Sequence, residues 1–171
     1  MKAHPTAIVH PNAKLACSVT VGPYSLVGEN VELGEDCEVM SHAVLDGNTR
    51  LGRGNRVFPY ASIGLAPQDL KYGGEPTRVE IGEGNTIREF VTIHRATVEG
   101  EGVTRIGSHN LLMAYVHIAH NCRLGDHVIM ANGASLAGHV EIQDYAWWVR
   151  FAAFTSSVAS APTVSWEVIV S

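Results

Sequence analysis

The stretch from Ala7 to Ala66 reads AIVHPN-AKLACS-VTVGPY-SLVGEN-VELGED-CEVMSH-AVLDGN-TRLGRG-NRVFPY-ASIGLA, a run of units of six residues. The third residue of each unit is aliphatic, and a glycine often follows it. A period of six fits neither the 3.6 of an α-helix nor the 2 of a plain strand. It fits a short strand followed by a turn, repeated around a closed coil, with the aliphatic residue pointing inward.

Three such units make a triangular coil of 18 residues, and coils of this kind stack about 4.8 Å apart as a parallel β-helix. Each coil buries its aliphatic residues only against its neighbours, so stability requires several coils. Chance alternation in a β-sandwich is the alternative. The expected inward residues are Val9, Leu15, Val21, Val27, Leu33, Val39, Leu45, Leu51, Val57, Ile63, Ile81, Ile87, Ile93, Ile106, Leu112, Ile118, Leu124, Met130, Leu136 and Ile142.

Two stretches break the period, at residues 65–77 and 95–103. Both carry glycines and charged residues, so we expect loops that project from a β-helix domain spanning residues 4–146. Loops on a rigid scaffold are frequent sites of substrate contact. After Ala146 the period is lost, and residues 147–171 form an aberrant tail rich in Ser, Ala, Thr and Val.

Composition excludes several classes of function. The net charge is −5, without the clustered Lys and Arg that nucleic-acid binding requires. No apolar run approaches the roughly 20 residues of a membrane span, and no basic stretch followed by an apolar run opens the sequence, so we do not expect secretion. The three cysteines, Cys17, Cys37 and Cys122, lack metal-ligand spacing. We therefore expect free thiols and a cytoplasmic protein.

Motifs around the interruptions are more specific than the period. They are QDLKY at 68–72, GEPTRVEIG at 74–82, IREFVTIHR at 87–95, GSHNLLM at 107–113 and HIAHNC at 117–122. From about His4 to Ala146 the chain resembles the UDP-N-acetylglucosamine acyltransferases, a family of hexapeptide-repeat enzymes. The resemblance implies an all-β, left-handed parallel β-helix, an exception to the usual right-handed crossover.

The resemblance also implies an activity: transfer of an (R)-3-hydroxyacyl group from acyl carrier protein to the 3-hydroxyl of UDP-N-acetylglucosamine, at the start of lipid A synthesis. It implies a homotrimer with sites between subunits. No metal or bound cofactor is expected, because the acyl donor carries its own phosphopantetheine. By resemblance His120 is the general base and the Gly138 N–H stabilises the oxyanion, while the contacts to the sugar nucleotide are Asp69, Lys71, His94, His117 and His139.

The residue types suit this chemistry. A sugar hydroxyl is a poor nucleophile at neutral pH, so its attack on a thioester needs a base, and histidine is suited to that task. His117 and His120 flank the inward Ile118 at offsets of −1 and +2, which places both on the coil surface or near a corner. Asn121 stands where a carboxylate sometimes orients the catalytic imidazole, and its carbonyl can still accept a hydrogen bond.

Other interpretations stay open at this stage. A surface histidine can simply be solvated, and Asp69 with Lys71 can be an ordinary loop ion pair. A zinc enzyme of the same fold, the γ-type carbonic anhydrase, uses three histidines across a trimer interface, and His94, His117 and His120 make that conceivable. The third possibility is an inactive fragment, because the helical C-terminal domain of the family is missing.

The tail has a hypothesis of its own. Read one base earlier, the codons of Phe154 to Val170 can spell a sequence like that of the family. The inward slots at 148, 154, 160 and 166 can then all become apolar, because Trp and Phe codons and four of the six Ser codons begin with T. We therefore interpret residues 147–171 as a frameshift product. Resequencing the gene tests this, since a clean read of the present tail contradicts a sequencing error.

Overall fold

The computed structural model describes residues 1–148, and these form 22 short strands in three parallel sheets. Sheet 1 contains β1 (Lys2–Ala3), β4 (Thr20–Val21), β7 (Glu38–Val39), β10 (Arg56–Val57), β13 (Thr86–Ile87), β16 (Leu111–Leu112), β19 (Ile129–Met130) and β22 (Trp147–Trp148). Sheet 2 contains β2 (Ile8–Val9), β5 (Leu26–Val27), β8 (Val44–Leu45), β11 (Ser62–Leu65), β14 (Thr92–His94), β17 (His117–Ile118) and β20 (Ser135–Leu136). Sheet 3 contains β3 (Lys14–Leu15), β6 (Glu32–Leu33), β9 (Asn48–Leu51), β12 (Arg78–Ile81), β15 (Val103–Ile106), β18 (Arg123–Leu124) and β21 (Glu141–Ile142).

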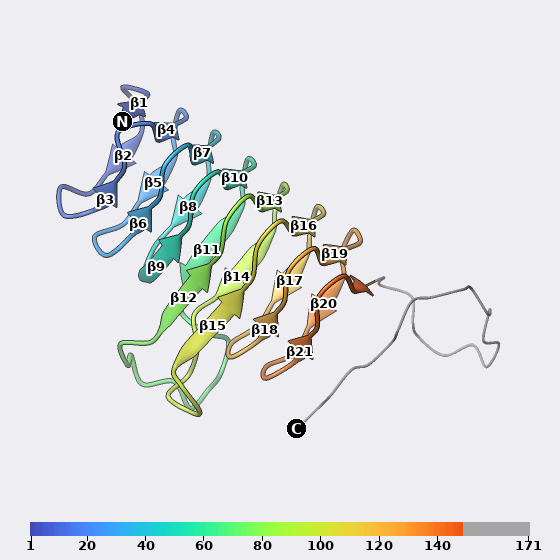
Figure 1. The fold of residues 1–171 in the computed structure, drawn as a ribbon. Coiled ribbons are helices and arrows are strands. Elements are labelled where there is room, and N and C mark those ends of the chain that lie inside the picture. The colour runs from blue at the N-terminus through green and yellow to red at the C-terminus, as the bar shows by residue number, and fades with distance from the viewer. Residues whose placement is uncertain (149–171) are drawn as a thin grey trace, which may run out of the picture.

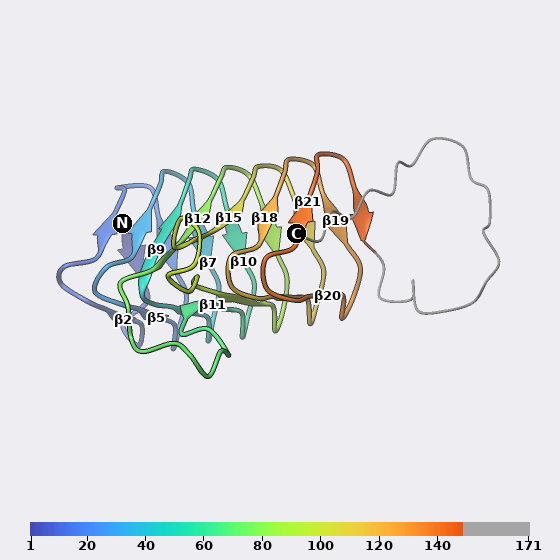
Figure 2. The same ribbon diagram turned by 90° about the horizontal axis from the view of Figure 1, so that it is seen from below.

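Each strand pairs with the strand three places along the chain, so the three sheets form the sides of a left-handed parallel β-helix (Figure 1). Figure 2 shows the coils as successive rungs from the N-terminus towards β22. The usual register joins residues 18 apart, as in Val21 with Val39. This confirms the coil of three hexads.

The two expected loops are present and leave the helix at the same corner. Ile63 pairs with Ile93, and Ile93 pairs with Ile118, so these two coils are longer than the ordinary ones. The first loop follows β11 and covers residues 66–77; the second follows β14 and covers 95–102 (Figure 1). Their bounds differ by one residue from the expected ones because Leu65 pairs with His94 across a bulge, and because Val103 already belongs to β15.

The expected inward residues form the core, and they are buried from Val21 to Ile142. A second buried column, not expected from the sequence, lies two residues before them. Valines, smaller residues and asparagines fill it, and its polar groups find partners. Asn55, Asn85 and Asn110 stack at successive coils, where Asn85 Nδ2 donates to Asn55 Oδ1 at 2.9 Å and Asn110 N donates to Asn85 Oδ1 at 2.8 Å.

The glycines that follow inward residues are explained by the spacing of coils. A Cβ on Gly34 would lie 2.7 Å from the carbonyl carbon of Gly52 in the next coil, which is far below ordinary contact. The residue two places after the position of these glycines in the turn has a positive φ, and in most turns this residue carries a side chain. Those residues are Tyr24, Asp36, His42, Tyr60, Phe90, His109, Tyr115, Asn121, His127, His139 and Tyr145.

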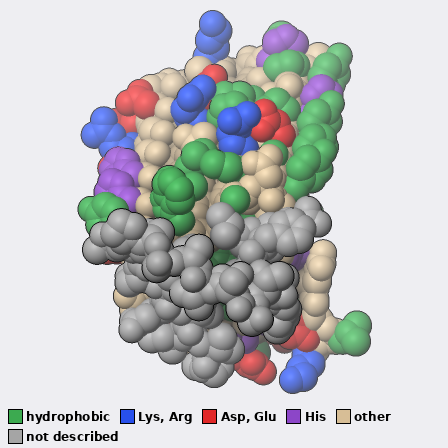
Figure 3. Space-filling view, turned by 90° about the vertical axis from the view of Figure 1, so that its right-hand side faces the viewer, with side chains coloured by type: hydrophobic (Ala, Val, Ile, Leu, Met, Phe, Trp, Pro, Cys, Tyr) green, Lys and Arg blue, Asp and Glu red, His purple; other side chains and the backbone are tan. Residues whose placement is uncertain are grey.

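Rings at these turns stack along the helix. The aromatic ladder consists of Tyr24, His42, Tyr60, Phe90 and Tyr115, at the corner between sheets 1 and 2. Its ring centroids are 4.9–5.1 Å apart, and the Tyr60, Phe90 and Tyr115 planes are within 5° of parallel. Its tyrosines and Phe90 are exposed, and the surface view shows hydrophobic side chains among the charged ones (Figure 3).

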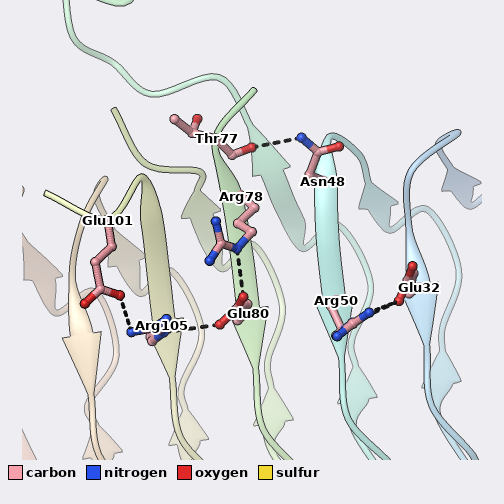
Figure 4. Close-up of polar contacts among 8 residues, drawn as sticks. All are labelled: Glu32, Asn48, Arg50, Thr77, Arg78, Glu80, Glu101 and Arg105. Atoms are coloured by element: carbon pink, nitrogen blue, oxygen red, sulfur yellow. Dashed lines mark hydrogen bonds and ion pairs between the residues drawn. The ribbon is translucent and has the colours of Figure 1, made fainter. Parts of the chain in front are cut away.

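The outer face of sheet 3 carries ion pairs between neighbouring coils (Figure 4). Arg50 pairs with Glu32, and the Nε of Arg105 lies 3.2 Å from the Glu80 carboxylate. These carboxyl groups have lowered pKa values, for Glu32 through hydrogen bonds from Lys14 and Arg50. Exposed pairs of this kind contribute about 0–1 kcal/mol each, so they set the charge pattern of the face more than its stability.

The ends of the domain extend beyond the expected 4–146. At the start, β1 pairs Lys2 with Thr20. At the other end, β22 pairs Trp148 with Met130, so the hexad register continues for two residues past Ala146, because a half-buried Trp148 fills the inward slot. The rest of the frameshift hypothesis concerns 149–171 and lies outside the described residues. Within residues 1–148, no helix is long and apolar enough to cross a membrane.

Candidate functional site

The turns from sheet 2 to sheet 3 in four consecutive coils form one edge of the molecule, which we term the site corner. They are the turns after β11, β14, β17 and β20. The first carries Asp69 in its loop, the second begins at His94, the third carries His120, and the fourth carries Gly138 and His139. Predicted residues that lie far apart in the sequence are therefore brought together by the stacking of coils.

His120 is the centre of this corner. Its Nδ1 lies 2.9 Å from Oδ1 of Asn121, and its Nε2 lies 4.0 Å from Oδ2 of Asp69. The His120 side chain is 17% exposed, so solvent and substrate can reach it. The Asn121 carbonyl can only accept, and it therefore selects the tautomer of His120 that carries its proton on Nδ1. The Nε2 lone pair is then available as a base.

Gly138 lies one coil beyond His120, at the equivalent turn position. A Cβ at this glycine would lie 2.6 Å from His120 Nε2, so any side chain here would displace the imidazole. The same turn position is held by Pro11, Pro23 and Pro59 in other coils. Because proline has no N–H, the stacking of coils does not require an N–H at this position. The Gly138 position is thus compatible with an N–H directed at a substrate.

His139 packs edge-on against His120, with ring centroids 5.2 Å apart and an interplanar angle of 86°. Its Nε2 lies 3.5 Å from Oε2 of Glu99 in the second loop. Glu99 was not expected from the sequence. A lone glutamate in a loop carries no signal of its own there, because its partner is distant in the sequence and meets it only through the fold.

His94 and His117 form a second pair on neighbouring coils, with centroids 5.1 Å apart. His117 Nδ1 lies 2.7 Å from the Thr92 hydroxyl. His94 is 7% exposed, and its Nδ1 has no partner in the described part of the chain. Burial lowers the pKa of both histidines, and for His94 the neighbouring His117, His120 and Arg95 lower it further. These shifts favour the neutral imidazole, which can both accept and donate a hydrogen bond.

Asp69 and Lys71 do not pair with each other. Oδ1 of Asp69 accepts a hydrogen bond of 2.9 Å from the backbone N–H of Lys71, which tightens the turn in the first loop. The Lys71 side chain is exposed and forms no ion pair within residues 1–148. The alternative of an Asp69–Lys71 ion pair is wrong for this structure. The carboxylate instead points its other oxygen towards His120.

The first loop is clamped by Arg95, which the sequence did not single out. Arg95 Nε donates to the Tyr72 hydroxyl at 2.9 Å, and Nη1 donates to the Gly64 carbonyl at 2.9 Å. The guanidinium also lies 5.4 Å from the centroid of the Tyr72 ring. Tyr72 in turn donates to the Glu75 carbonyl at 2.7 Å. These contacts fix the loop that carries Asp69.

Metal chemistry needs ligands that converge on one point. Within residues 1–148, no group of three or more His, Cys, Asp or Glu side chains is arranged to hold a metal ion. Within one chain, His94 and His117 lie edge-on to each other, and His120 contacts Asn121 and His139. Metal analysis of the purified protein tests a zinc site shared between subunits.

Comparisons with known proteins agree with the architecture. Residues 104–138 match the family described as bacterial transferase hexapeptide (six repeats). The chain is 52% identical over 144 residues to the acyl-[acyl-carrier-protein]–UDP-N-acetylglucosamine O-acyltransferase of Thermodesulfovibrio yellowstonii, covering 84% of this chain and 56% of that protein. It is 54% identical over 153 residues to the protein of the same name from Herminiimonas arsenicoxydans, covering 90% of this chain and 57% of that one.

Among solved structures, LpxA from Acinetobacter baumannii superposes with a TM-score of 0.84 at 49% identity. The match covers 85% of this chain and 56% of that one. The chain therefore spans little more than half the length of the curated relatives it matches. All the residues of the site corner lie within the part of the chain that the structure describes.

Proposed function

The chain belongs to the family of the acyl-[acyl-carrier-protein]–UDP-N-acetylglucosamine O-acyltransferases, of whose length it spans little more than half, and from this premise we propose its reaction. The chain transfers an (R)-3-hydroxyacyl group from acyl carrier protein to the 3-hydroxyl of UDP-N-acetylglucosamine, the first step of lipid A synthesis. The observation that carries the proposal is His120, with Nδ1 held by Asn121 and Nε2 facing Asp69 and Gly138.

The step follows from these positions. Nε2 of His120 takes the proton of the sugar 3-hydroxyl as the oxygen attacks the thioester carbonyl. The negative charge that develops on the carbonyl oxygen is stabilised by the N–H of Gly138. The carbon–sulfur bond then breaks, and the departing thiolate of phosphopantetheine takes up the proton from His120. A base of this kind contributes about 10²–10⁴-fold to the rate.

The remaining residues serve to bind the sugar nucleotide. Asp69 can only accept hydrogen bonds, so it suits a sugar hydroxyl beside the one that reacts. Neutral His94 and His117 suit further polar groups of the ligand. The buried Nδ1 of His94, which has no partner within residues 1–148, can form a hydrogen bond with one of these groups. Lys71, exposed on the first loop, suits the diphosphate, and His139 supports His120 from the next coil.

The proposal extends to partners and compartment. The active unit is a homotrimer with sites between subunits, and the donor is acyl carrier protein, so no resident metal or cofactor is needed. The buried free thiols of Cys37 and Cys122 support a reducing compartment, the cytoplasm. Sedimentation tests the assembly: a mass of three times 18.4 kDa is expected, and a monomer at working concentration contradicts it.

The activity is tested by incubating the chain with UDP-N-acetylglucosamine and 3-hydroxyacyl carrier proteins of several acyl lengths. Mass spectrometry should find the 3-O-acyl sugar nucleotide. His120→Asn should lower the rate about 10²–10⁴-fold. His127→Ala, at a turn on another corner of the coil, is the matched control and should keep the rate. Folded chain that makes no product with any donor would falsify the proposal and establish the inactive-fragment alternative.

A further inference from the structure

The outward residues of sheet 3 form one column across its strands, and their charges follow a pattern. Up to β15, residues in register on neighbouring strands carry opposite charges; they are Lys14, Glu32, Arg50, Glu80 and Arg105. The alternation breaks at the next strand, where Arg105 lies in register with Arg123. Neighbouring strands are about 4.8 Å apart, so two guanidinium groups are brought together. Like charges in this arrangement repel each other and need an anion to compensate them.

The second loop supplies this anion as the carboxylate of Glu101. Its Oε2 lies 2.5 Å from Nη1 of Arg105, and its Oε1 lies 2.9 Å from Nη2 of Arg123. The two oxygens therefore bridge the two guanidinium groups. Figure 4 shows Arg105 between Glu101 and Glu80. The hydrogen bond from Arg123 and the charge of Arg105 lower the pKa of Glu101, so its carboxylate is ionised at neutral pH.

The bridge is open to solvent, so an external anion can reach it. The side chains of Arg105, Arg123 and Glu101 are 39%, 45% and 51% exposed. A groove of about 520 Å³ opens beside the two arginines, which form part of its lining. Glu141 and Asp144 line the same groove. Because these two carboxylates repel an anion, the arginine end is the part of the groove where one can bind.

The two arginines suit a phosphate group better than they suit a carboxylate. Each guanidinium offers N–H donors in a fixed plane, which matches the oxygens of a phosphate. A phosphate group carries nearly two negative charges and three acceptor oxygens at neutral pH, whereas a carboxylate carries one charge and two oxygens. Exposed ion pairs are weak, so Glu101 leaves the arginines often enough for another anion to take its place.

We propose that Arg105 and Arg123 form a binding site for a phosphate group on the outer face of sheet 3, and that Glu101 occupies this site until phosphate displaces it. Displacement frees residues 100–102 at the end of the second loop, while Thr97 stays buried at its start. The site lies on the face of sheet 3 and not at the site corner. The inference therefore does not rest on the proposed acyl transfer.

The test is a titration of the full chain with inorganic phosphate, followed through the NMR signals of the arginine Nε–H groups. Sodium chloride keeps the ionic strength constant. We expect saturable shifts at Arg105 and Arg123, and faster exchange of the backbone amides of Gly100 and Glu101 as phosphate binds. Arg123→Gln should abolish the saturable shift at Arg105. Glu101→Gln should lower the apparent Kd for phosphate about two- to fivefold, because it removes the carboxylate that competes for the site.

Two control variants separate this site from other effects of charge. Glu32→Gln is the matched control, because Glu32 also contacts two cations on the same face, Lys14 and Arg50. It should leave the apparent Kd at Arg105 unchanged, and a decrease equal to that of Glu101→Gln overturns the inference. Lys71→Gln removes the proposed contact to the diphosphate and should also leave this Kd unchanged.

The remaining outcomes are independent of catalysis. Shifts at Arg105 that rise with phosphate without saturating overturn the inference, whether or not acyl transfer is detected. An apparent Kd in Glu101→Gln equal to that of the native chain overturns it as well. A chain that binds phosphate at Arg105 and Arg123 but makes no acylated sugar nucleotide contradicts the proposed function and leaves this site in place.

Discussion

At the scale of single residues, Gly138 shows how closely the site corner is packed. Its missing side chain leaves the room that the His120 imidazole occupies in the coil before it. We expect Gly138→Ala to lower the rate of acyl transfer about 100-fold, since a displacement of about 1 Å in a catalytic group has that effect. Thermal unfolding should change little, because the new methyl group lies at the surface end of a turn. Activity retained at the native rate contradicts the placement of His120.

His94 gives stability a pH dependence. Its pKa is lowered in the folded protein, chiefly by burial, so the unfolded chain binds more protons below the ordinary histidine pKa of about 6.5. The free energy of unfolding therefore keeps its full value above about pH 6.5, and it falls as the pH is lowered towards the pKa of His94 in the folded protein. Urea unfolding at pH 7.5 and 5.5 should show this loss, and His94→Asn should reduce it. An equal loss in both proteins contradicts the assignment.

At the scale of the structural element, the aromatic ladder balances two opposing terms. Each of its residues has a positive φ, which costs about 1–2 kcal/mol for a residue with a side chain. Each stacked pair of rings contributes about 0.5–1.5 kcal/mol beyond simple burial. Phe90 stacks on both Tyr60 and Tyr115. The ladder therefore offsets the backbone strain of the turns that it occupies.

This balance distinguishes two substitutions of Phe90. Phe90→Ala loses both stacks and keeps the strained backbone, whereas Phe90→Gly loses the stacks but removes the strain. We expect the alanine variant to be less stable than the glycine variant by about 1 kcal/mol. Denaturant unfolding of the two proteins measures the difference. Equal stability, or a less stable glycine variant, means that the turn is not strained.

The first loop depends on Arg95 for its shape. In Arg95→Met the hydrogen bonds to Tyr72 and Gly64 are lost, so the loop should open more often. Trypsin should then cut after the exposed Lys71 several times faster than in the native chain. Arg53→Met, which removes an exposed guanidinium 3.9 Å from Asp36, serves as the control. Unchanged cleavage at Lys71 in Arg95→Met contradicts the clamp.

The same elements show what sequence alone can predict. The column of inward residues was predictable because a period of six places one aliphatic side chain per turn, as Ile93 and Ile118 illustrate. The two loops were predictable as breaks in the period, whereas their exit at the same corner was seen only in the structure. The contacts of Arg95 and Glu99 were not predictable, since their partners are distant in the sequence and no period links them. The sequence suggested that Asn121 accepts a hydrogen bond from His120, but its hydrogen bonds to Thr97 and Glu99 of the second loop were seen only in the structure.

At the scale of the whole molecule, both loops leave the helix at one corner, where they do not interrupt the three sheets. The loops of 66–77 and 95–102 both leave at the site corner, and the register of the sheets resumes after each. The core of sheets 1, 2 and 3 is therefore continuous from Val21 to Ile142. A rigid stack with loops at one edge fixes the side chains carried by the coils, while the loops can vary without disturbing the core.

Stacking in which each coil touches only its neighbours also has a mechanical consequence. Under tension applied at the two ends of the chain, coils should peel off one at a time instead of together. An ordinary coil of 18 residues releases about 60 Å of chain, at roughly 3.4 Å per residue. The two coils that contain the loops release more, about 100 and about 85 Å. Single-molecule pulling should therefore record a ladder of equal steps interrupted by two longer ones, a mechanical signature of where the loops were inserted.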